Sequence, residues 1–485
     1  MKLNNILKGI EYRTLIGNGE VEVGSICFDS RKAEPGSLYV ARRGTVSDGH
    51  TYIPDVVARG AVAVICEELP ESHAEGVAWV VVGSADHALG LAAANFYDNP
   101  SHKLHLVGVT GTNGKTTIAT LLYDLFEGLG YKSGLISTVV YRLHNVSEPS
   151  THTTPDPLTL NRLLAEMVEM GCDYCFMEVS SHSIVQERIA GLRYEVAAFT
   201  NITHDHLDYH KTFAEYIKAK KRLFDQLPAE AIAVVNGDDR NGEIMLQNCK
   251  AAHTYFSTRG VGDHNCKVLE MGLEGMLLDI DGRQLWVRLI GKFNASNILA
   301  VYAIASALGV DKEELLVVLS KLQSVKGRFE QISGSGVTAI VDYAHTPDAL
   351  DKVLDTIIEM EPCGRIITVV GCGGERDRTK RPEMATTAVE KSQMVIFTSD
   401  NPRSEDPNAI IDEMVAGVGG KNNYLCIADR AQAIRTAVMT ANAGDVILVA
   451  GKGHEDYQII GSTKHPFSDQ AHLEEFLTQK ENNNK

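Results

Sequence analysis

The stretch from Gly108 to Thr117 has the residue types and the order of a loop that binds nucleoside triphosphates. It reads Gly-Val-Thr-Gly-Thr-Asn-Gly-Lys-Thr-Thr, follows a mostly apolar run at 104–107 and precedes an apolar run with helical spacing at 118–122. In such a strand, glycine-rich turn and helix, backbone N–H groups face the phosphates, Lys115 adds a positive charge, and the hydroxyl of Thr116 can bind Mg²⁺. The first glycine stands one position earlier than in the standard pattern, and an ordinary strand-to-helix turn is the alternative.

Other polar clusters follow predicted strands downstream of this loop. Glu178 opens a Glu-Val-Ser-Ser-His sequence directly after an apolar run at 174–177. Residues 200–208, which include His206, follow another apolar run at 196–199. Because ligands of parallel α/β sheets gather at the carboxyl ends of the strands, we expect both clusters to lie near the phosphate loop.

The alternation of strands and helices that positions these residues predicts an α/β fold of three domains. Residues 1–103 consist of short βα units. Residues 104–327 form a central P-loop ATPase domain, in which a mostly parallel sheet is covered by helices on both faces and carries a small antiparallel insertion at about 266–290. The pattern restarts in residues 328–485, which predict a Rossmann-like domain with disorder at 480–485.

The composition agrees with several compact domains. A chain of 485 residues is too long for one core, and 44% hydrophobic with 22% charged residues is typical of globular proteins. No apolar run approaches the roughly 18–20 residues of a membrane span, and the first residues lack the apolar core of a signal peptide. The nine cysteines lack the spacing of a disulfide framework. We therefore expect a cytoplasmic protein.

The net charge of −17 argues against nucleic acid as a main partner, because binding an extended phosphate backbone needs clustered Lys and Arg. It leaves room for a small anionic ligand, since one pocket can be basic on an acidic protein.

Three weaker signals have simple structural explanations. The Asp-Ser-Arg sequence around Ser30 is either an anion-binding corner or a capped turn. Cys172 and Cys175 form a single C-x-x-C inside a run that predicts a buried strand, which disfavours a zinc site. Gly371-x-Gly373 lacks the rest of a dinucleotide-binding fingerprint.

Taken together, the motifs resemble those of the Mur ligases, ATP-dependent enzymes that add amino acids to the UDP-linked peptide precursor of the bacterial cell wall. The resemblance covers essentially the whole chain. It rests on the phosphate loop, Glu178 with Ser-Ser-His, the Asp-His-Leu-Asp-Tyr-His sequence at 205–210 with Lys220 downstream, Asn-Ala-Ser-Asn at 294–297, Arg328, and Asp-Tyr-Ala-His-Thr-Pro at 342–347.

The resemblance implies a role for each domain: UDP-substrate binding in the first, ATP binding in the second and amino-acid binding in the third. It implies a catalytic centre of Lys115, Glu178, His206 and Lys220, with Mg²⁺ bound by Thr116, Glu178, His206 and a carbamate on Lys220. The implied ATP contacts are Gly111, Thr112, Asn113, Gly114, Lys115, Thr116, Thr117, Asn294, Asn297, Arg328, Asp342 and His345.

Further matches point to the branch of the family that adds meso-diaminopimelate to UDP-N-acetylmuramoyl-L-alanyl-D-glutamate. The implied contacts of the UDP precursor are Ser30, Thr153, Thr154, Ser180, Gln186 and Arg188, and His152 stands where some relatives have Asn. The implied contacts of the diamino acid are Arg376, Asp400, Asn401, Pro402, Arg403, Gly451 and Glu455. In relatives that add lysine, the position of Arg403 usually carries a neutral residue.

This chemistry makes physical demands that the residues can meet. ATP activates a carboxylate as an acyl phosphate, and because both reactants are anions, Lys115 and two Mg²⁺ ions are needed to offset their repulsion. An unmodified Lys220 would be a cation beside Mg²⁺, which favours the carbamate over the alternative of a solvated helix lysine. A monomer is expected.

Two other functions fit parts of the pattern. Folylpolyglutamate synthetase has a similar loop and the same acyl-phosphate chemistry, but Asp-Asn-Pro-Arg at 400–403 and a UDP-binding domain are not expected of it. A regulatory nucleotide-binding protein would lack the metal-binding and acyl-phosphate residues, which are all present here.

Overall fold

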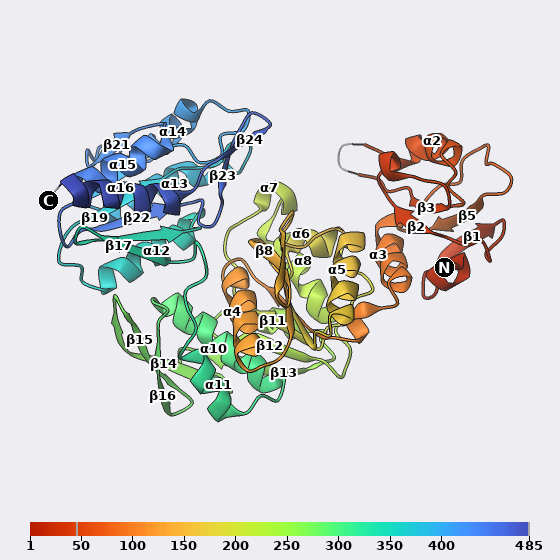
Figure 1. Cartoon of the computed structure of the whole chain (residues 1–485), viewed down its shortest axis with the longest axis horizontal. Coiled ribbons are helices and arrows are strands. Elements are labelled where there is room, and N and C mark those ends of the chain that lie inside the picture. Colours follow the sequence, from red (N-terminus) through yellow and green to blue (C-terminus); the bar gives the residue numbers. More distant parts are fainter. Residues whose placement is uncertain (45–46, 484–485) are drawn as a thin grey trace.

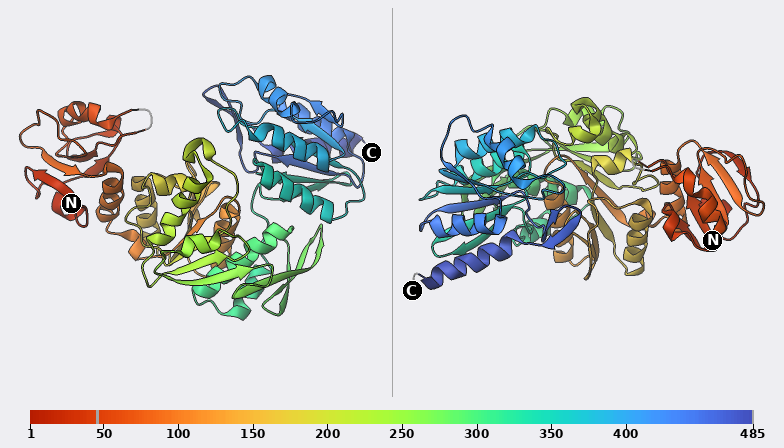
Figure 2. Two further views of the ribbon diagram at one scale, coloured as in Figure 1. Left: turned by 180° about the vertical axis from the view of Figure 1, so that it is seen from behind. Right: turned by 90° about the horizontal axis from the view of Figure 1, so that it is seen from above.

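The computed structural model describes residues 1–44 and 47–483, without the side chain of Asp208. Three α/β domains follow one another along the chain, and the central one lies between the other two (Figure 1). Views from behind and from above show the same order, with the central domain between the other two (Figure 2). None of the helices in these residues is long and apolar enough to cross a membrane.

The N-terminal sheet has the order β1-β5-β4-β3-β2, and every pair is parallel except β1 with β5. Alternate strand residues face two clusters: α1 and α3 pack on one face and α2 on the other. The elements are α1 (Leu3–Ile6), β1 (Tyr12–Ile16), β2 (Ser25–Cys27), η1 (Ser30–Lys32), β3 (Ser37–Val40), η2 (Gly49–Tyr52), α2 (Ile53–Ala58), β4 (Ala63–Cys66), β5 (Ala78–Val82), α3 (Ala85–Phe96) and η3 (Pro100–His102).

The central sheet has eleven strands in the order β16-β15-β14-β13-β12-β11-β6-β10-β7-β8-β9. The middle strands, from β14 to β7, pair in parallel, whereas the β14–β16 insertion and the β8–β9 hairpin are antiparallel. Its strands are β6 (His105–Thr110), β7 (Ser133–Ile136), β8 (Val140–Leu143), β9 (Val146–Pro149), β10 (Tyr174–Glu178), β11 (Val196–Phe199), β12 (Ile232–Asn236), β13 (Ala252–Ser257), β14 (His264–Gly272), β15 (Gly275–Ile280) and β16 (Arg283–Val287).

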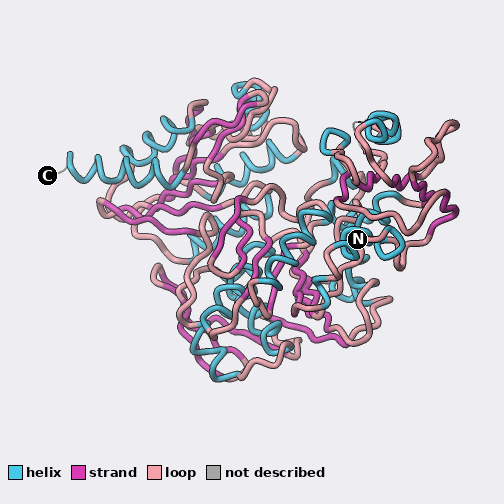
Figure 3. Tube along the Cα trace, turned by 45° about the vertical axis from the view of Figure 1, so that its right-hand side comes forward, coloured by secondary structure: helices cyan, strands magenta, loops and turns pink. Residues whose placement is uncertain are grey.

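Helices cover both faces of the central sheet, as the cyan and magenta segments of Figure 3 show. Helices α4, α10 and α11 bury one face, and α5, α6, α8 and α9 bury the other. The helices are α4 (Lys115–Gly128), α5 (Pro157–Glu169), α6 (Ser181–Val185), α7 (Leu207–His210), α8 (Phe213–Asp225), α9 (Gly242–Leu246), α10 (Lys292–Ala307) and α11 (Lys312–Leu319). Strand residues alternate between the faces: Leu106 packs on one and Val107 on the other.

The C-terminal sheet has the order β17-β18-β22-β19-β20-β21, and only β17 with β18 is antiparallel. Helices α12, α13 and α14 pack on one face and α15 and α16 on the other. The elements are β17 (Glu330–Gly334), β18 (Val337–Asp342), α12 (Pro347–Glu359), β19 (Ile366–Val370), α13 (Lys380–Lys391), β20 (Met394–Phe397), α14 (Pro407–Val415), β21 (Tyr424–Cys426), α15 (Arg430–Thr440), β22 (Val446–Ala450), β23 (Tyr457–Ile460), β24 (Thr463–Pro466) and α16 (Asp469–Asn483).

Local sequence explains where half of the α-helices in the described residues begin. A side-chain oxygen of the residue before the helix accepts a first-turn N–H in each of these cases: Ser84, Asp156, Ser180, Thr212, Asp311, Thr346, Asp406 and Asp429. Helices α4 and α10 instead begin after Gly114 and Gly291, which have positive φ angles and no capping side chain. The first-turn N–H groups of these two helices therefore have no capping side chain to satisfy them.

The expectation of disorder at 480–485 is wrong for residues 480–483, which continue α16; residues 484–485 lie outside the described chain. Leu473, Phe476 and Leu477 recur at helical spacing and are buried, and Lys480 donates to the carbonyls of Val438 and Ala441. The apolar face of α16 packs against the C-terminal sheet, and this packing holds the helix in place up to its polar end.

Candidate active site

A cavity of about 1470 Å³ lies between the central and C-terminal domains. The phosphate loop, the ends of β10 and β11, and the loops after β18, β19, β20 and β22 contribute to its wall. Because all of these strands are parallel members of their sheets, their carboxyl ends meet at this cavity, as expected for α/β proteins.

The phosphate loop requires glycine at two positions. A Cβ atom on Gly111 would lie 1.9 Å from the hydroxyl of Thr200, and one on Gly114 would lie 2.6 Å from the side-chain oxygen of Asn297. Gly114 also has a φ of +90°, which disfavours other residues. The loop therefore packs tightly against its neighbours, with the start of α4 directed at the cavity, the arrangement that binds phosphate.

Lys115 lies on this loop with its ammonium group 2.9 Å from the carbonyl oxygen of Gly111 and 2.8 Å from that of Thr112. Burial lowers the pKa of Lys115, while the carboxylates of Glu178 and Asp205 act in the opposite direction. Both partners of the ammonium are neutral, so its charge remains to interact with an anion.

Glu178 and His206 face the loop from the ends of β10 and the β11–α7 segment. Glu178 is buried and accepts the N–H of Thr138 at 2.7 Å. His206 has a left-handed φ of +55°, and its Nε2 lies 3.3 Å from Asp205. Burial lowers the pKa of His206 to about 3 against the opposing effect of Asp205, so the imidazole is neutral, the form that binds metals.

Lys220, on α8, is a completely enclosed lysine. It is 1% exposed, its Nζ donates to the carbonyl of Gly111 at 2.8 Å, and it lies 4.7 Å from the centre of the Tyr216 ring. Burial, followed by the charge of Lys115, lowers the pKa of Lys220 well below its usual value. No carboxylate pairs with its ammonium group among the described residues, and the neutral amine is therefore favoured.

Within the described ranges, no group of three or more His, Cys, Asp or Glu side chains has the arrangement of a metal site. Glu178 and His206 provide two suitable ligands at the same cavity as Thr116 and Lys220. A carbamate on Lys220 would add the carboxylate-like oxygens that the unmodified chain lacks, so these residues fit Mg²⁺ once Lys220 is modified.

The C-terminal domain contacts the phosphate loop directly. Arg328 donates to the hydroxyl of Thr116 at 3.0 Å and lies over the Tyr343 ring. Asn113 donates to Asp348 at 3.1 Å. These polar contacts place the guanidinium of Arg328, which precedes β17, beside the first turn of α4.

The remaining residues expected to contact ATP support this wall. Asn297 donates to Asn294 at 3.0 Å, and Asp342 accepts the N–H of Phe329 at 2.7 Å. Burial raises the pKa of Asp342. Burial also lowers the pKa of His345, and the nearby positive charge of Lys380 lowers it further.

A second group of residues forms a network beside Glu178. Arg188 donates to the side chain of Gln186 at 2.7 and 3.0 Å and to the carbonyl of Thr154 at 2.8 Å. Thr154 donates to the carbonyl of Glu178, and Ser180 caps α6. None of the described acidic side chains forms an ion pair with Arg188, so this network presents a cation with neutral partners.

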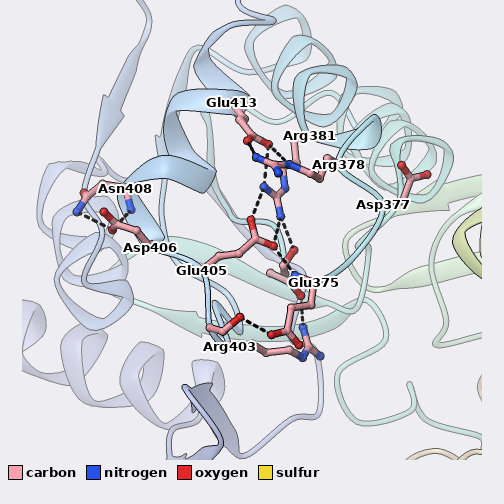
Figure 4. Close-up of polar contacts among 12 residues, drawn as sticks. Glu375, Asp377, Arg378, Arg381, Arg403, Glu405, Asp406, Asn408 and Glu413 are labelled. Carbon is pink, nitrogen blue, oxygen red and sulfur yellow. Dashed lines mark hydrogen bonds and ion pairs between the residues drawn. The ribbon is translucent and has the colours of Figure 1, made fainter. Parts of the chain in front are cut away.

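The third group lies on loops of the C-terminal domain. Arg403, half-buried with a φ of +53°, donates to the carbonyl of Gly374 at 2.7 Å (Figure 4). Burial lowers its pKa, and the positive charge of Arg376 lowers it further. A Cβ atom on Gly373 would lie 3.2 Å from a guanidinium nitrogen of Arg403 and 3.6 Å from Cγ of Arg376, so both arginine side chains lie against Gly373. Asn401 and Glu455 lie nearby, bonded to each other at 2.8 Å.

Most expected site residues line the cavity, and five do not. Gly111, Asn294, Gln186 and Pro402 lie behind lining residues, whereas Ser30 lies in the N-terminal domain, in a turn capped by Asp29. The capped turn was one of the two interpretations of that sequence.

Sequence reasoning missed several charged residues in or near this wall: Asp205 and Lys380 line the cavity, whereas Asp348 and Lys452 do not. Asp205, Asp348, Lys380 and Lys452 were not singled out, although each is adjacent or nearly adjacent to a residue that was. Lys452 is completely buried and donates to Asn401 at 3.1 Å and to Glu455 at 2.8 Å. Its position between Gly451 and Glu455 was the available signal.

The fold and cavity define a three-domain α/β protein in which a phosphate-binding loop is completed by a second domain. Three family descriptions match successive parts of the chain: "Mur ligase family, catalytic domain" at residues 22–97, "Mur ligase middle domain" at 109–305 and "Mur ligase, glutamate ligase domain" at 327–453. The chain belongs to the Mur ligase family.

Named relatives are similar to this chain over nearly its full length. The chain is 55% identical over 485 residues to a protein of Parabacteroides distasonis, covering 99% of this chain and 100% of the relative. It is 53% identical over 481 residues to a protein of Cytophaga hutchinsonii, covering 98% and 99%. Both relatives are named UDP-N-acetylmuramoyl-L-alanyl-D-glutamate--2,6-diaminopimelate ligase.

Solved structures agree with the fold. One of a protein with that same name is 31% identical, with a TM-score of 0.69 and 99% of each chain covered. A Mycobacterium tuberculosis folylpolyglutamate synthase is 16% identical, with a TM-score of 0.62 over 75% of this chain and 92% of its own. The latter similarity concerns the fold alone.

Gly114→Ala tests the tight packing of the phosphate loop. We expect it to weaken ATP binding by about 10-fold or more, because the added Cβ collides with Asn297 and displaces the loop. Gly130→Ala is the matched control, since Gly130 has a similar φ of +93° and open space around it. Both variants carry a backbone strain of about 1–2 kcal/mol. Equal ATP affinity in the two, measured by calorimetry, would contradict this account.

Proposed function

We propose that this chain is an ATP-dependent ligase that joins meso-diaminopimelate to UDP-N-acetylmuramoyl-L-alanyl-D-glutamate during peptidoglycan synthesis. The observation that carries the proposal is one cavity whose wall contains the phosphate loop with Lys115 and the two neighbouring arginines Arg376 and Arg403. The names of relatives 52–55% identical over nearly the whole chain support the same reaction.

In the first step, an oxygen of the terminal glutamate carboxylate attacks the γ-phosphorus of ATP, and ADP leaves. Lys115 and the first-turn N–H groups of α4 stabilise the negative charge that develops on the transferred phosphoryl group. Arg328, bonded to Thr116 next to Lys115, adds a second cation at the first turn of α4.

In the second step, the amino group of the diamino acid attacks the acyl carbon, its proton is lost, and phosphate leaves. We propose that Arg188, together with Thr153, Thr154, Ser180 and Gln186, binds the precursor, and that Ser30 binds its uridine end. Glu455 and Asp400 provide negative charge for the ammonium group that does not react. The different domains thus supply different substrates to one reaction centre.

Mg²⁺ would be held by Thr116, Glu178, His206 and a carbamate on Lys220, and would neutralise phosphate charge during the transfer. The carbamate forms when the neutral amine of Lys220 attacks carbon dioxide, making a N–C bond and releasing a proton. The burial of Lys220 and its lowered pKa support this modification, because only the unprotonated amine is nucleophilic.

The folylpolyglutamate reaction is the alternative within the same chemistry. Two features disfavour it: the N-terminal domain, which we propose binds the UDP end of the precursor, and the Arg376–Arg403 pair. A cytoplasmic monomer is the expected form.

The reaction is tested by measuring ATP turnover with the UDP-linked dipeptide or the diamino acid omitted in turn. We expect release of ADP and phosphate only when the UDP-linked dipeptide and meso-diaminopimelate are both present. Turnover with a folate acceptor in place of the dipeptide would contradict the proposal.

Lys220→Ala should lower ligation by about 10²-fold or more, since a metal ligand is lost. A short carboxylic acid at high concentration should partly restore activity, because it can occupy the position of the carbamate. Lys218→Ala is the control, since Lys218 lies on the same helix with a side chain that is 72% exposed. Failure of isotope-labelled bicarbonate to label the wild-type protein at Lys220 would refute the modification.

Arg403→Asn should lower kcat/KM for meso-diaminopimelate by about 10²-fold, as expected for about 3 kcal/mol from a buried charge contact. Asparagine is neutral and tolerates the left-handed backbone at this position. The KM for ATP should stay unchanged, and Arg435→Asn, on the exposed side of α15, should behave as wild type. If the wild-type enzyme prefers lysine over meso-diaminopimelate in competition, the assignment of Arg403 is wrong.

A further inference from the structure

Two loops at the edge of the cavity carry the two neighbouring arginines. The first, residues 371–377, follows β19 and carries Arg376; the second, residues 400–405, follows β20 and carries Arg403. Neither arginine forms an ion pair with an acidic side chain in the part of the chain that the structure describes. Like charges repel, so the distance between the two arginines must be fixed by other contacts.

Arg381, on the first turn of α13, touches both loops. It is completely buried, and its guanidinium donates to Glu405 at 2.9 and 3.0 Å and to the carbonyl of Gly373 at 3.3 Å. It also donates to Glu413 of α14 at 2.8 Å. Figure 4 shows Arg381 between the two carboxylates, with Arg378 on the outer side of Glu413.

Glu405 extends this contact to the first loop. Its Oε1, which also accepts from Arg381, accepts the N–H of Glu375, next to Arg376, and the hydroxyl of Ser404 donates to the carboxylate of Glu375. The loops are also in backbone contact, since the N–H of Gly374 donates to the carbonyl of Asn401 at 2.9 Å. A Cβ on Gly374 would lie 2.0 Å from the carbonyl oxygen of Pro402, so the approach is too close for any side chain.

This geometry has a function beyond stability. A buried guanidinium that binds two carboxylates and a carbonyl sets the positions of all three, because its donors form a planar, rigid fork. Glu405 is two residues from Arg403, and Gly373 is three residues from Arg376. The position of Arg381 therefore determines the separation of the two arginines that line the cavity.

We propose that Arg381 is a positioning residue for substrate selection: by holding the 371–377 and 400–405 loops together through Glu405 and Gly373, it sets the arginine spacing that distinguishes a diamino acid with a second carboxylate from one without. The inference rests on the proposed function. It predicts that loosening this contact changes selectivity before it changes the use of ATP.

The test compares Arg381→Lys and Glu405→Gln with the wild-type full-length enzyme. Lysine keeps the charge of Arg381 but cannot reproduce its fork, and glutamine keeps the shape of Glu405 without its charge. We expect KM for meso-diaminopimelate to rise about 10-fold or more, with kcat within about threefold, because small misplacements of binding groups are costly. The ratio of kcat/KM for meso-diaminopimelate to that for lysine should fall by a similar factor, and KM for ATP should not change.

Arg365→Lys is the control, because Arg365 also donates twice to a carboxylate, that of Asp445, before β19 at the opposite end of the strand. It should leave the ratio unchanged. Thermal unfolding identifies any variant that fails to fold; Glu405→Gln retains the Arg381–Glu413 contact and serves if Arg381→Lys does not fold. Folded variants with the wild-type ratio would overturn the inference while leaving the ligase proposal intact. A wild-type enzyme that cannot use meso-diaminopimelate would defeat the proposed function instead.

Discussion

The central physical constraint on this structure is that positive charge must be available in the cavity between two domains of an acidic protein. The net charge is −17, yet Lys115, Arg328, Arg376 and Arg403 all line the same cavity. A buried cation is costly unless it is paired or hydrogen-bonded. Here Lys115, Arg376 and Arg403 follow parallel strands and Arg328 precedes β17, and carbonyl oxygens and hydroxyl groups can satisfy their donors without neutralising them.

The sheets provide this arrangement because two of them direct their carboxyl ends at one space. The central sheet contributes the phosphate loop after β6, and the C-terminal sheet contributes the loops after β19, β20 and β22. Close approach then depends on glycine: Gly111 and Gly114 allow the phosphate loop to pack against Thr200 and Asn297, and Gly374 allows two C-terminal loops to touch. Arg328, which precedes β17, completes the site by bonding to Thr116 of the central domain. Reaction centres built this way depend on contacts between domains as much as on either domain alone.

Much of the architecture was predictable because it depends on local patterns. The strand at Val196–Phe199, the antiparallel insertion and the helix after the phosphate loop follow from apolar periodicity and glycine placement, and the structure confirms them. The β8–β9 hairpin was not predicted, since its exposed edge strand lacks a clear apolar alternation. Arg381 was hidden for a different reason. It follows a charged run that resembles a solvated surface, and its partners Glu405 and Glu413 lie 24 and 32 residues away, so only the tertiary fold reveals that it is buried. Burial of a charged residue is a nonlocal property.

The way each cation is bonded separates those that hold the structure together from those that are available to substrates. Arg381, Arg430 and Arg365 pair with carboxylates: Arg430 with Asp469, for example, in a pair with no exposed surface on either side chain. Lys115, Arg188 and Arg403 bond instead to backbone carbonyls or an amide side chain. A cation with neutral partners keeps an attraction for anions that a paired one has lost, at the cost of a less favourable folded state. Lys452 belongs with the paired group, since it lines no part of the cavity and pairs with Glu455. Pairing with a carboxylate thus distinguishes the cations that support the structure from those that are available to bind the substrates.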